Sequence, residues 1–205
     1  MAERVLLIEE LSAVGEGVRS YVQYAHDHRV IEHELLFPVS ELPDLRRIVP
    51  ERKAMSCCEV VTAATGTSNR TVVGARGVSV VADMTLDVYL SGMTELPDAV
   101  VVPGGVNGSK NISECQAALT VIGEMNEKGR IVAAICAAPA VVLGKTTVLA
   151  GRKWTCYPGY EEEVPESIRA THVQERVVES ENLVTSAGAG CSESRQGRKL
   201  IFCKQ

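Results

Sequence analysis

Between residues 58 and 190 the chain alternates short runs of β-branched residues with longer amphipathic or glycine-bounded stretches. This alternation predicts parallel strands joined by crossover helices. Several runs are apolar almost throughout, as expected for strands covered by helices on both faces. The predicted strands are Arg4–Ile8, Glu59–Ala63, Gly77–Val81, Ala99–Val102, Arg130–Ile135, Arg152–Thr155 and Asn182–Thr185. We therefore expect an α/β fold with a mostly parallel sheet.

The stretch from Ser113 to Lys128 predicts a helix that begins with Ser113 as its N-cap and stops at Gly129. Its apolar face is expected to consist of Leu119, Ile122 and Met125. A second helix is expected over Gly17–His28.

The two ends of the chain are harder to interpret. Ile31–Cys58 has mixed periodicity and is interrupted by three prolines, and the residues after Gly190 are polar and lack a helical stripe. We expect a folded core over residues 58–190, with residues 31–57 and 191–205 atypical and weakly protected against hydrogen exchange.

Composition limits the classes of function. A chain of 205 residues with 45% apolar content favours a single domain over residues 1–205. The net charge of -5, without a dense Lys or Arg stretch, argues against nucleic acid as the main partner. No signal peptide or membrane span is apparent, and the seven cysteines lack paired CxxC spacing. These features predict a cytoplasmic protein with reduced thiols and no metal site.

The segment Gly129–Gly144, GRIVAAICAAPAVVLG, carries the strongest chemical signal. An apolar strand runs directly into Cys136 and then into a helix start of small residues, which would expose the thiol at the carboxyl edge of the sheet. Free amides and a helix N-terminus at such a turn favour the reactive thiolate. The alternative is an inert thiol buried in the core.

Several further motifs accompany this segment in a fixed order. They are GARGVSVVAD (Gly74–Asp83), DAVVVPGG (Asp98–Gly105), NISE (Asn111–Glu114), WTCYP (Trp154–Pro158) and TSAGAG at residues 185–190. Together with Gly129–Pro139 this set resembles the ThiJ/PfpI superfamily, and within it the branch of the Parkinson disease deglycase (DJ-one-like). The resemblance implies a flavodoxin-like three-layer α/β/α sandwich, a homodimer, and neither a metal nor an organic cofactor.

The resemblance also implies roles for individual residues. Cys136 would be the nucleophile, and the backbone amides of Gly105 and Ala137 would form an oxyanion-type site; a plain turn is the alternative at Gly105. Tyr157 would donate a hydrogen bond into the pocket or be a half-buried structural tyrosine. Arg76 would lie near the pocket and the dimer contact or be a surface arginine.

A carboxyl partner for the thiolate is expected near the first strand, at Glu16 or, in a second alignment, at Glu34; an exposed carboxylate is the alternative for each. The peptidase-like branch has a histidine where this chain has Ala137, so a Cys–His peptidase is not expected. His172 is interpreted as a surface histidine, and Cys156 as a small buried residue or a second redox-sensitive thiol.

The function implied is that of a cysteine-dependent glyoxalase or deglycase acting on methylglyoxal, glyoxal or their early adducts with amines and thiols. The alternative is a non-enzymatic oxidative-stress sensor or chaperone-like protein that uses the same reactive cysteine.

Overall fold

A computed structural model of the chain describes residues 3–9, 58–73 and 79–188. The expected helix over Gly17–His28, the stretch from Ile31 to Cys57 and the tail after Gly190 lie outside these residues. Within them, no helix is long and apolar enough to cross a membrane.

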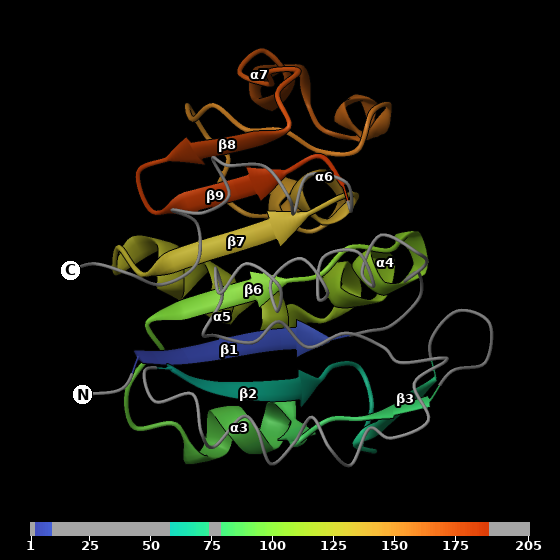
Figure 1. The fold of residues 1–205 in the computed structure, drawn as a ribbon, viewed down its shortest axis with the longest axis vertical. Coiled ribbons are helices and arrows are strands. Elements are labelled where there is room, and N and C mark those ends of the chain that lie inside the picture. The colour runs from blue at the N-terminus through green and yellow to red at the C-terminus, as the bar shows by residue number, and fades with distance from the viewer. Residues whose placement is uncertain (1–2, 10–57, 74–78, 189–205) are drawn as a thin grey trace, which may run out of the picture.

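A seven-stranded sheet forms the centre of the described fold (Figure 1). Its strand order is β5-β2-β1-β6-β7-β9-β8, and every neighbouring pair is parallel except β9 and β8. The strands are β1 (Glu3–Glu9), β2 (Cys58–Ala64), β5 (Met84–Thr85), β6 (Ala99–Val102), β7 (Ile131–Ile135), β8 (Val177–Ser180) and β9 (Leu183–Ser186). The mostly parallel sheet predicted from the sequence is confirmed.

Two of the predicted strands are placed differently. The part of Gly77–Val81 that is described, β4 (Ser79–Val81), pairs antiparallel with β3 (Thr71–Val73) in a separate two-stranded sheet. Arg152–Thr155 is not a strand: within it, Trp154 makes one isolated bridge to His172. The segment does not pair with a neighbouring strand because its backbone bonds to a side chain instead. The Thr155 N–H donates to the hydroxyl of Thr185 at 2.9 Å.

The helical elements are shorter than the sequence pattern suggested. They are α3 (Leu86–Gly92), α4 (Val106–Glu114), α5 (Gln116–Glu127), α6 (Ala138–Val141), α7 (Glu166–Arg169), and the 3₁₀ turns η3 (Leu143–Lys145) and η4 (Tyr160–Glu163). Ser113 is not an N-cap but belongs to α4, where its hydroxyl donates to the Lys110 carbonyl at 2.7 Å. Cys115 is extended and separates α4 from α5, so the expected single helix from Ser113 is wrong at its start.

The predicted stop at Gly129 is confirmed. Gly129 has a φ of 66°, its N–H donates to Asn126, and the next N–H, of Arg130, donates to Met125. These two bonds are those of a Schellman motif, which favours glycine because of the left-handed backbone. The chain therefore turns directly from α5 into β7.

The core lies between the sheet and its helices. Helix α5 packs on β6 and β7, and α5 and α6 lie behind the sheet in Figure 1. The fully buried side chains here include Val100, Val102, Ile112, Ile122, Met125, Leu143 and Leu149. Since β6 and β7 run parallel, their carboxyl ends lie at the same edge of the sheet. Gly104 comes shortly after the end of β6, and Cys136 comes directly after the end of β7, so both lie at this edge.

Candidate active site

Cys136 occupies a strained turn directly after β7. Its φ is 64°, a left-handed conformation that residues other than glycine adopt only under constraint from their surroundings. Both of its backbone polar groups are fixed: its N–H donates to the Ser186 carbonyl at 2.8 Å, and its carbonyl accepts from the Tyr157 N–H at 2.8 Å. The half-buried thiol is therefore presented from a rigid position between the ends of β7 and β9.

The backbone of Gly104 lies against the side chain of Cys136. A Cβ atom on Gly104 would be 2.6 Å from the Cys136 Cβ, 3.0 Å from the Ile135 carbonyl oxygen and 3.5 Å from the Cys136 Sγ. No side chain fits at these distances, so the close approach requires glycine. The following residue, Gly105, has a φ of 99° and is the N-cap of α4.

Ala137 is fully buried and is the N-cap of α6. Gly105 and Ala137 are thus both N-cap residues, positions at which helices leave backbone amides without partners inside the helix. Helix α6 has only four residues and is followed by the 3₁₀ turn η3. An oxyanion role for the two amides stays a prediction.

Tyr157 contacts the elbow through its backbone, by the hydrogen bond to the Cys136 carbonyl. Its side chain is 50% exposed, and its ring meets that of Tyr160 edge-on with centroids 6.2 Å apart. The structure therefore brings Tyr157 to the site, whereas a hydrogen bond from its hydroxyl into the pocket stays a prediction. Glu16, Glu34 and Arg76 lie outside the described residues.

A hollow of about 590 Å³ lies elsewhere, between the end of β2, strand β3 and the junction of α4 with α5. Cys115 contributes to its lining, together with Thr65 and Asn111. Cys136 does not, so we do not place the chemistry of the thiol in this hollow.

Comparison with known proteins identifies the family of the chain. The profile of the DJ-1/PfpI family matches residues 23–194, most of the chain. The chain belongs to the DJ-1/PfpI family. Of the relatives, DJ-1 homolog A of Arabidopsis thaliana is 37% identical over 108 residues, 52% of this chain and 27% of that protein. A deglycase of Pyrococcus horikoshii is 34% identical over 94 residues, 46% of this chain and 54% of that protein.

Solved structures of the DJ-1/PfpI family agree with the fold. Oxidised DJ-1 of Toxoplasma gondii superposes with a TM-score of 0.66 at 25% identity, covering 93% of this chain and 85% of that one. The flavodoxin-like α/β fold predicted from the sequence is therefore confirmed. The chain spans about a quarter of the length of the Arabidopsis relative and about half of the Pyrococcus relative that it matches.

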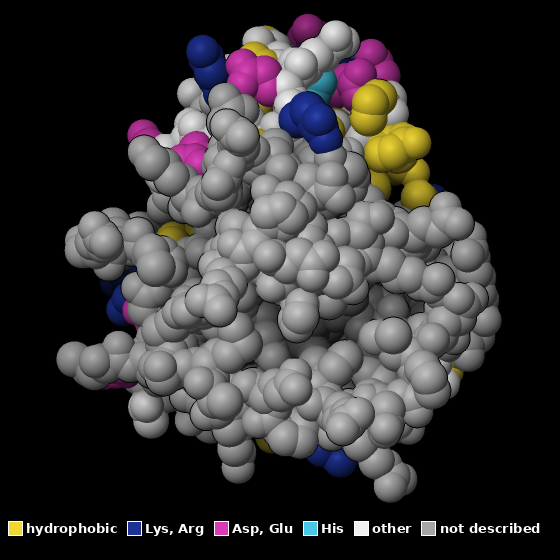
Figure 2. All heavy atoms as spheres, viewed as in Figure 1, with side chains coloured by type: hydrophobic (Ala, Val, Ile, Leu, Met, Phe, Trp, Pro, Cys, Tyr) yellow, Lys and Arg dark blue, Asp and Glu magenta, His cyan; other side chains and the backbone are white. Residues whose placement is uncertain are grey.

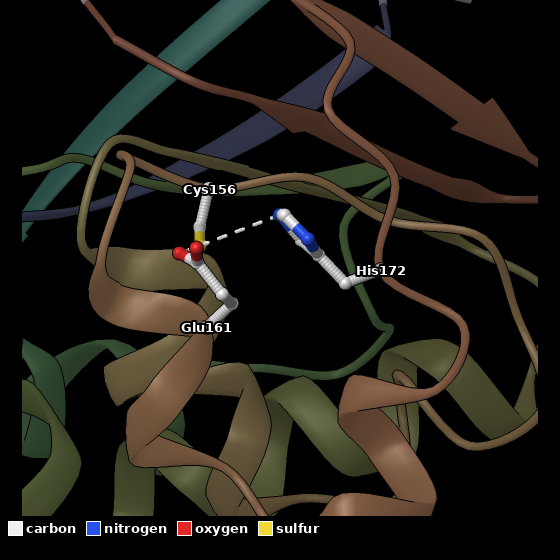
Figure 3. Close-up of side chains that lie close together, drawn as sticks. All are labelled: Cys156, Glu161 and His172. Atoms are coloured by element: carbon white, nitrogen blue, oxygen red, sulfur yellow. Dashed lines mark hydrogen bonds between the residues drawn. The ribbon is translucent and has the colours of Figure 1, made fainter.

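A polar cluster that the sequence did not predict lies beside the elbow of this DJ-1/PfpI member. It consists of Cys156, Glu161 and His172 (Figure 3). Cys156 is 2% exposed, which confirms the interpretation as a buried residue. Interpreting His172 as a surface histidine was wrong: it is half-buried, and its ring packs edge-on against Trp154 with centroids 4.9 Å apart.

The environment of Cys156 keeps it protonated. Burial raises the pKa of its thiol to about 12, with further increases from the charges of Glu161 and Cys136. The raised pKa means that the folded state holds this proton more tightly than the unfolded chain. The protonated Cys156 thiol therefore contributes fully to the stability of the fold below pH 9, and this contribution is lost as the pH rises from about 9 to about 12.

These environments predict the order in which the thiols react. At neutral pH, iodoacetamide should modify Cys136 before Cys156, because alkylation requires an accessible thiolate and Cys156 is buried and protonated. We expect Cys136 to be the first of the seven thiols labelled, as measured by peptide mass spectrometry over a time course. First labelling at any other cysteine, whether Cys57, Cys58, Cys191 or a cysteine of the described core, would contradict this order.

Proposed function

We propose that the chain is a cysteine-dependent glyoxalase or deglycase that converts methylglyoxal, glyoxal or their early adducts into hydroxy acids. The observation that carries the proposal is Cys136 at a φ of 64°, with the backbone of Gly104 against its side chain. A thiol fixed in this way meets the geometric requirement for covalent catalysis, since reaction with a carbonyl requires a positioned nucleophile. A relative named as a deglycase supports the same chemistry.

The reaction begins with attack of the Cys136 thiolate on the aldehyde carbon of methylglyoxal. A carbon–sulfur bond forms, the carbonyl electron pair moves to oxygen, and the amides of Gly105 and Ala137 stabilise the resulting alkoxide. Protonation of this oxygen gives a hemithioacetal. A carboxylate then removes the proton from the former aldehyde carbon and returns it to the neighbouring carbon, while the hydroxyl proton of the hemithioacetal passes to the former ketone oxygen, giving the thioester of lactate. Water hydrolyses the thioester, so the net reaction is methylglyoxal plus water to lactate.

The carboxylate in this scheme is assigned to Glu16, with Glu34 as the alternative. If Glu16 transfers the proton, Glu16→Gln should lower turnover by about 10²- to 10⁴-fold, whereas Glu34→Gln should have a small effect. Lactate formation by the two purified variants, with matched circular dichroism spectra, measures the difference. The reverse order would assign the role to Glu34, and small effects in both would remove each residue from the mechanism.

Steady turnover separates this proposal from the alternative of a redox sensor or chaperone-like protein. An enzyme should produce many lactate molecules per Cys136 at a constant rate, measured with lactate dehydrogenase. A sensor that merely carries a reactive thiol would consume at most stoichiometric aldehyde and release no lactate. The latter result would overturn the proposed function.

Three further parts of the proposal rest on the family resemblance. They are a homodimer, a position of Arg76 near the pocket and the dimer contact, and a hydrogen bond from the Tyr157 hydroxyl toward bound substrate. Analytical ultracentrifugation tests the first, and the kinetics of Arg76→Ala and Tyr157→Phe test the others.

A further inference from the structure

The Cys156, Glu161 and His172 cluster brings together three side chains of the types that bind transition metals. The Cys156 Sγ lies 3.9 Å from a Glu161 carboxylate oxygen and 4.0 Å from the His172 Nε2, and all three atoms lie within 4.8 Å of one another. Figure 3 shows the carboxylate and the imidazole approaching the sulfur from different sides. Three separate segments supply these groups: the stretch after Trp154, the 3₁₀ turn η4, and the residues after α7.

These distances are close to those of a tetrahedral zinc site. Bonds of about 2.3 Å to sulfur and about 2.0–2.1 Å to nitrogen or oxygen place neighbouring ligand atoms about 3.6 Å apart. The sulfur–oxygen and sulfur–nitrogen distances of 3.9 and 4.0 Å therefore need to shorten by only a few tenths of an ångström. The third pair, the Glu161 oxygen and the His172 nitrogen, lies within 4.8 Å and must approach to about 3.4 Å. A thiolate, an imidazole and a carboxylate form a donor set suited to Zn²⁺ and Co²⁺ rather than to Mg²⁺ or Ca²⁺.

The surrounding contacts already orient the three groups. The same Glu161 oxygen accepts the Gly159 N–H at 2.6 Å, and the backbone N–H of His172 donates to the Arg169 carbonyl at 2.9 Å, which fixes the main chain that carries the imidazole. The ring of His172 is held edge-on against Trp154, which is fully buried. Contacts of this kind around metal ligands reduce the reorganisation that binding requires.

The local charge also favours a cation. Turn η4 contains three consecutive glutamates, Glu161, Glu162 and Glu163, and Glu166 follows at the start of α7. Arg169 pairs with Glu162 and Glu166, so it neutralises only part of this charge. Figure 2 shows acidic and basic side chains gathered over the end of the molecule that η4, α7 and β8 form. Around the cluster itself, these four carboxylates outnumber the one arginine that pairs with two of them.

From this arrangement we propose that Cys156, Glu161 and His172 form a binding site for Zn²⁺ or a similar transition-metal ion, with a water molecule as fourth ligand. Binding replaces the thiol proton: the metal–sulfur bond forms as one proton leaves Cys156 for solvent. The site would tie η4 and the residues after α7 to the segment that follows Trp154, next to the elbow of Cys136. This inference is independent of the proposed function.

A binding experiment on the reduced full-length chain tests the site without any activity measurement. Co²⁺ should produce a sulfur-to-cobalt charge-transfer band and the visible bands of tetrahedral coordination. Zn²⁺, measured against a chromophoric chelator, should displace the Co²⁺ at one equivalent. We expect Cys156→Ser to abolish the charge-transfer band and His172→Gln and Glu161→Gln to weaken Zn²⁺ binding by at least about 10-fold.

Two matched variants separate this site from other thiols and acids of the chain. Cys115→Ser removes a half-buried thiol outside the cluster, and Glu162→Gln neutralises the acid next to Glu161. Cys115→Ser should retain the site's bands and affinity, and Glu162→Gln should retain the bands and lose much less affinity than Glu161→Gln. If Cys156→Ser does not fold, the His172 and Glu161 variants decide the question. Equal Zn²⁺ affinity in the cluster variants and the unchanged protein, or a lack of the Co²⁺ bands in the unchanged protein, would overturn the proposal.

Discussion

Replacing Cys136 with serine should lower the steady rate of lactate formation from methylglyoxal by at least about 10³-fold. The substitution keeps a side chain of similar size at the turn but replaces the thiolate with a hydroxyl, which is far less nucleophilic at neutral pH. The hydrogen bonds to Ser186 and Tyr157 come from the backbone of Cys136, so the turn itself should persist. Initial rates at saturating methylglyoxal measure the effect.

Cys115→Ser provides the control for this variant. Cys115 is also half-buried, but it lies between α4 and α5 rather than at the elbow. Its replacement should leave the rate within about two-fold of the unchanged protein, because surface-proximal substitutions away from the site have small effects. Similar losses in both variants would indicate a general loss of structure, and an unchanged rate in Cys136→Ser would exclude Cys136 as the nucleophile.

The second large effect is expected for Gly104→Ala. The added Cβ would lie 2.6 Å from the Cys136 Cβ and 3.0 Å from the Ile135 carbonyl, so the loop or the elbow must move. A displacement of about 1 Å of a reacting group can reduce a rate by about 10²-fold, and overpacking typically costs about 1–3 kcal/mol. Lactate formation and urea unfolding of the same preparation measure both consequences.

Gly123→Ala is the matched control for Gly104→Ala. Gly123 lies within α5, and a Cβ there would meet no atom within 4 Å. Because alanine favours a helix over glycine by about 1 kcal/mol, this variant should keep full activity and unfold at a higher urea concentration. Full activity in Gly104→Ala would show that the close contact does not position the thiol.

The elements predicted correctly from the sequence are those whose pattern is local. Ala99–Val102 is an uninterrupted apolar run ending in three valines, and the strand has the predicted bounds. Gly129 stops α5 because a left-handed residue is required there. The errors arise where long-range bonds outweigh the local pattern. Arg152–Thr155 resembles a strand in sequence, but Thr155 bonds the Thr185 side chain and Trp154 bridges to His172 instead.

The same distinction applies to the candidate site. Cys136 and Gly105 could be proposed as site residues because a strand followed by a small-residue turn is visible within a few positions of the sequence, whereas the contact of Gly104 with Cys136 appears only in the structure. The cluster of Cys156, Glu161 and His172 could not, since His172 reaches Cys156 only after the chain passes through η4 and α7. The spacing of the cysteines also does not indicate that one of them lies beside a carboxylate and an imidazole distant in the sequence.

Titration of activity against modification of Cys136 tests whether this thiol is the nucleophile. Limiting iodoacetamide is added to the reduced protein, the modified fraction of each cysteine is measured by peptide mass spectrometry, and lactate formation is measured on the same samples. We expect the rate to fall in proportion to the unmodified fraction of Cys136 and to reach background when that thiol is fully modified. A rate that persists in protein with Cys136 fully modified, or that follows the modification of another cysteine, would contradict this expectation.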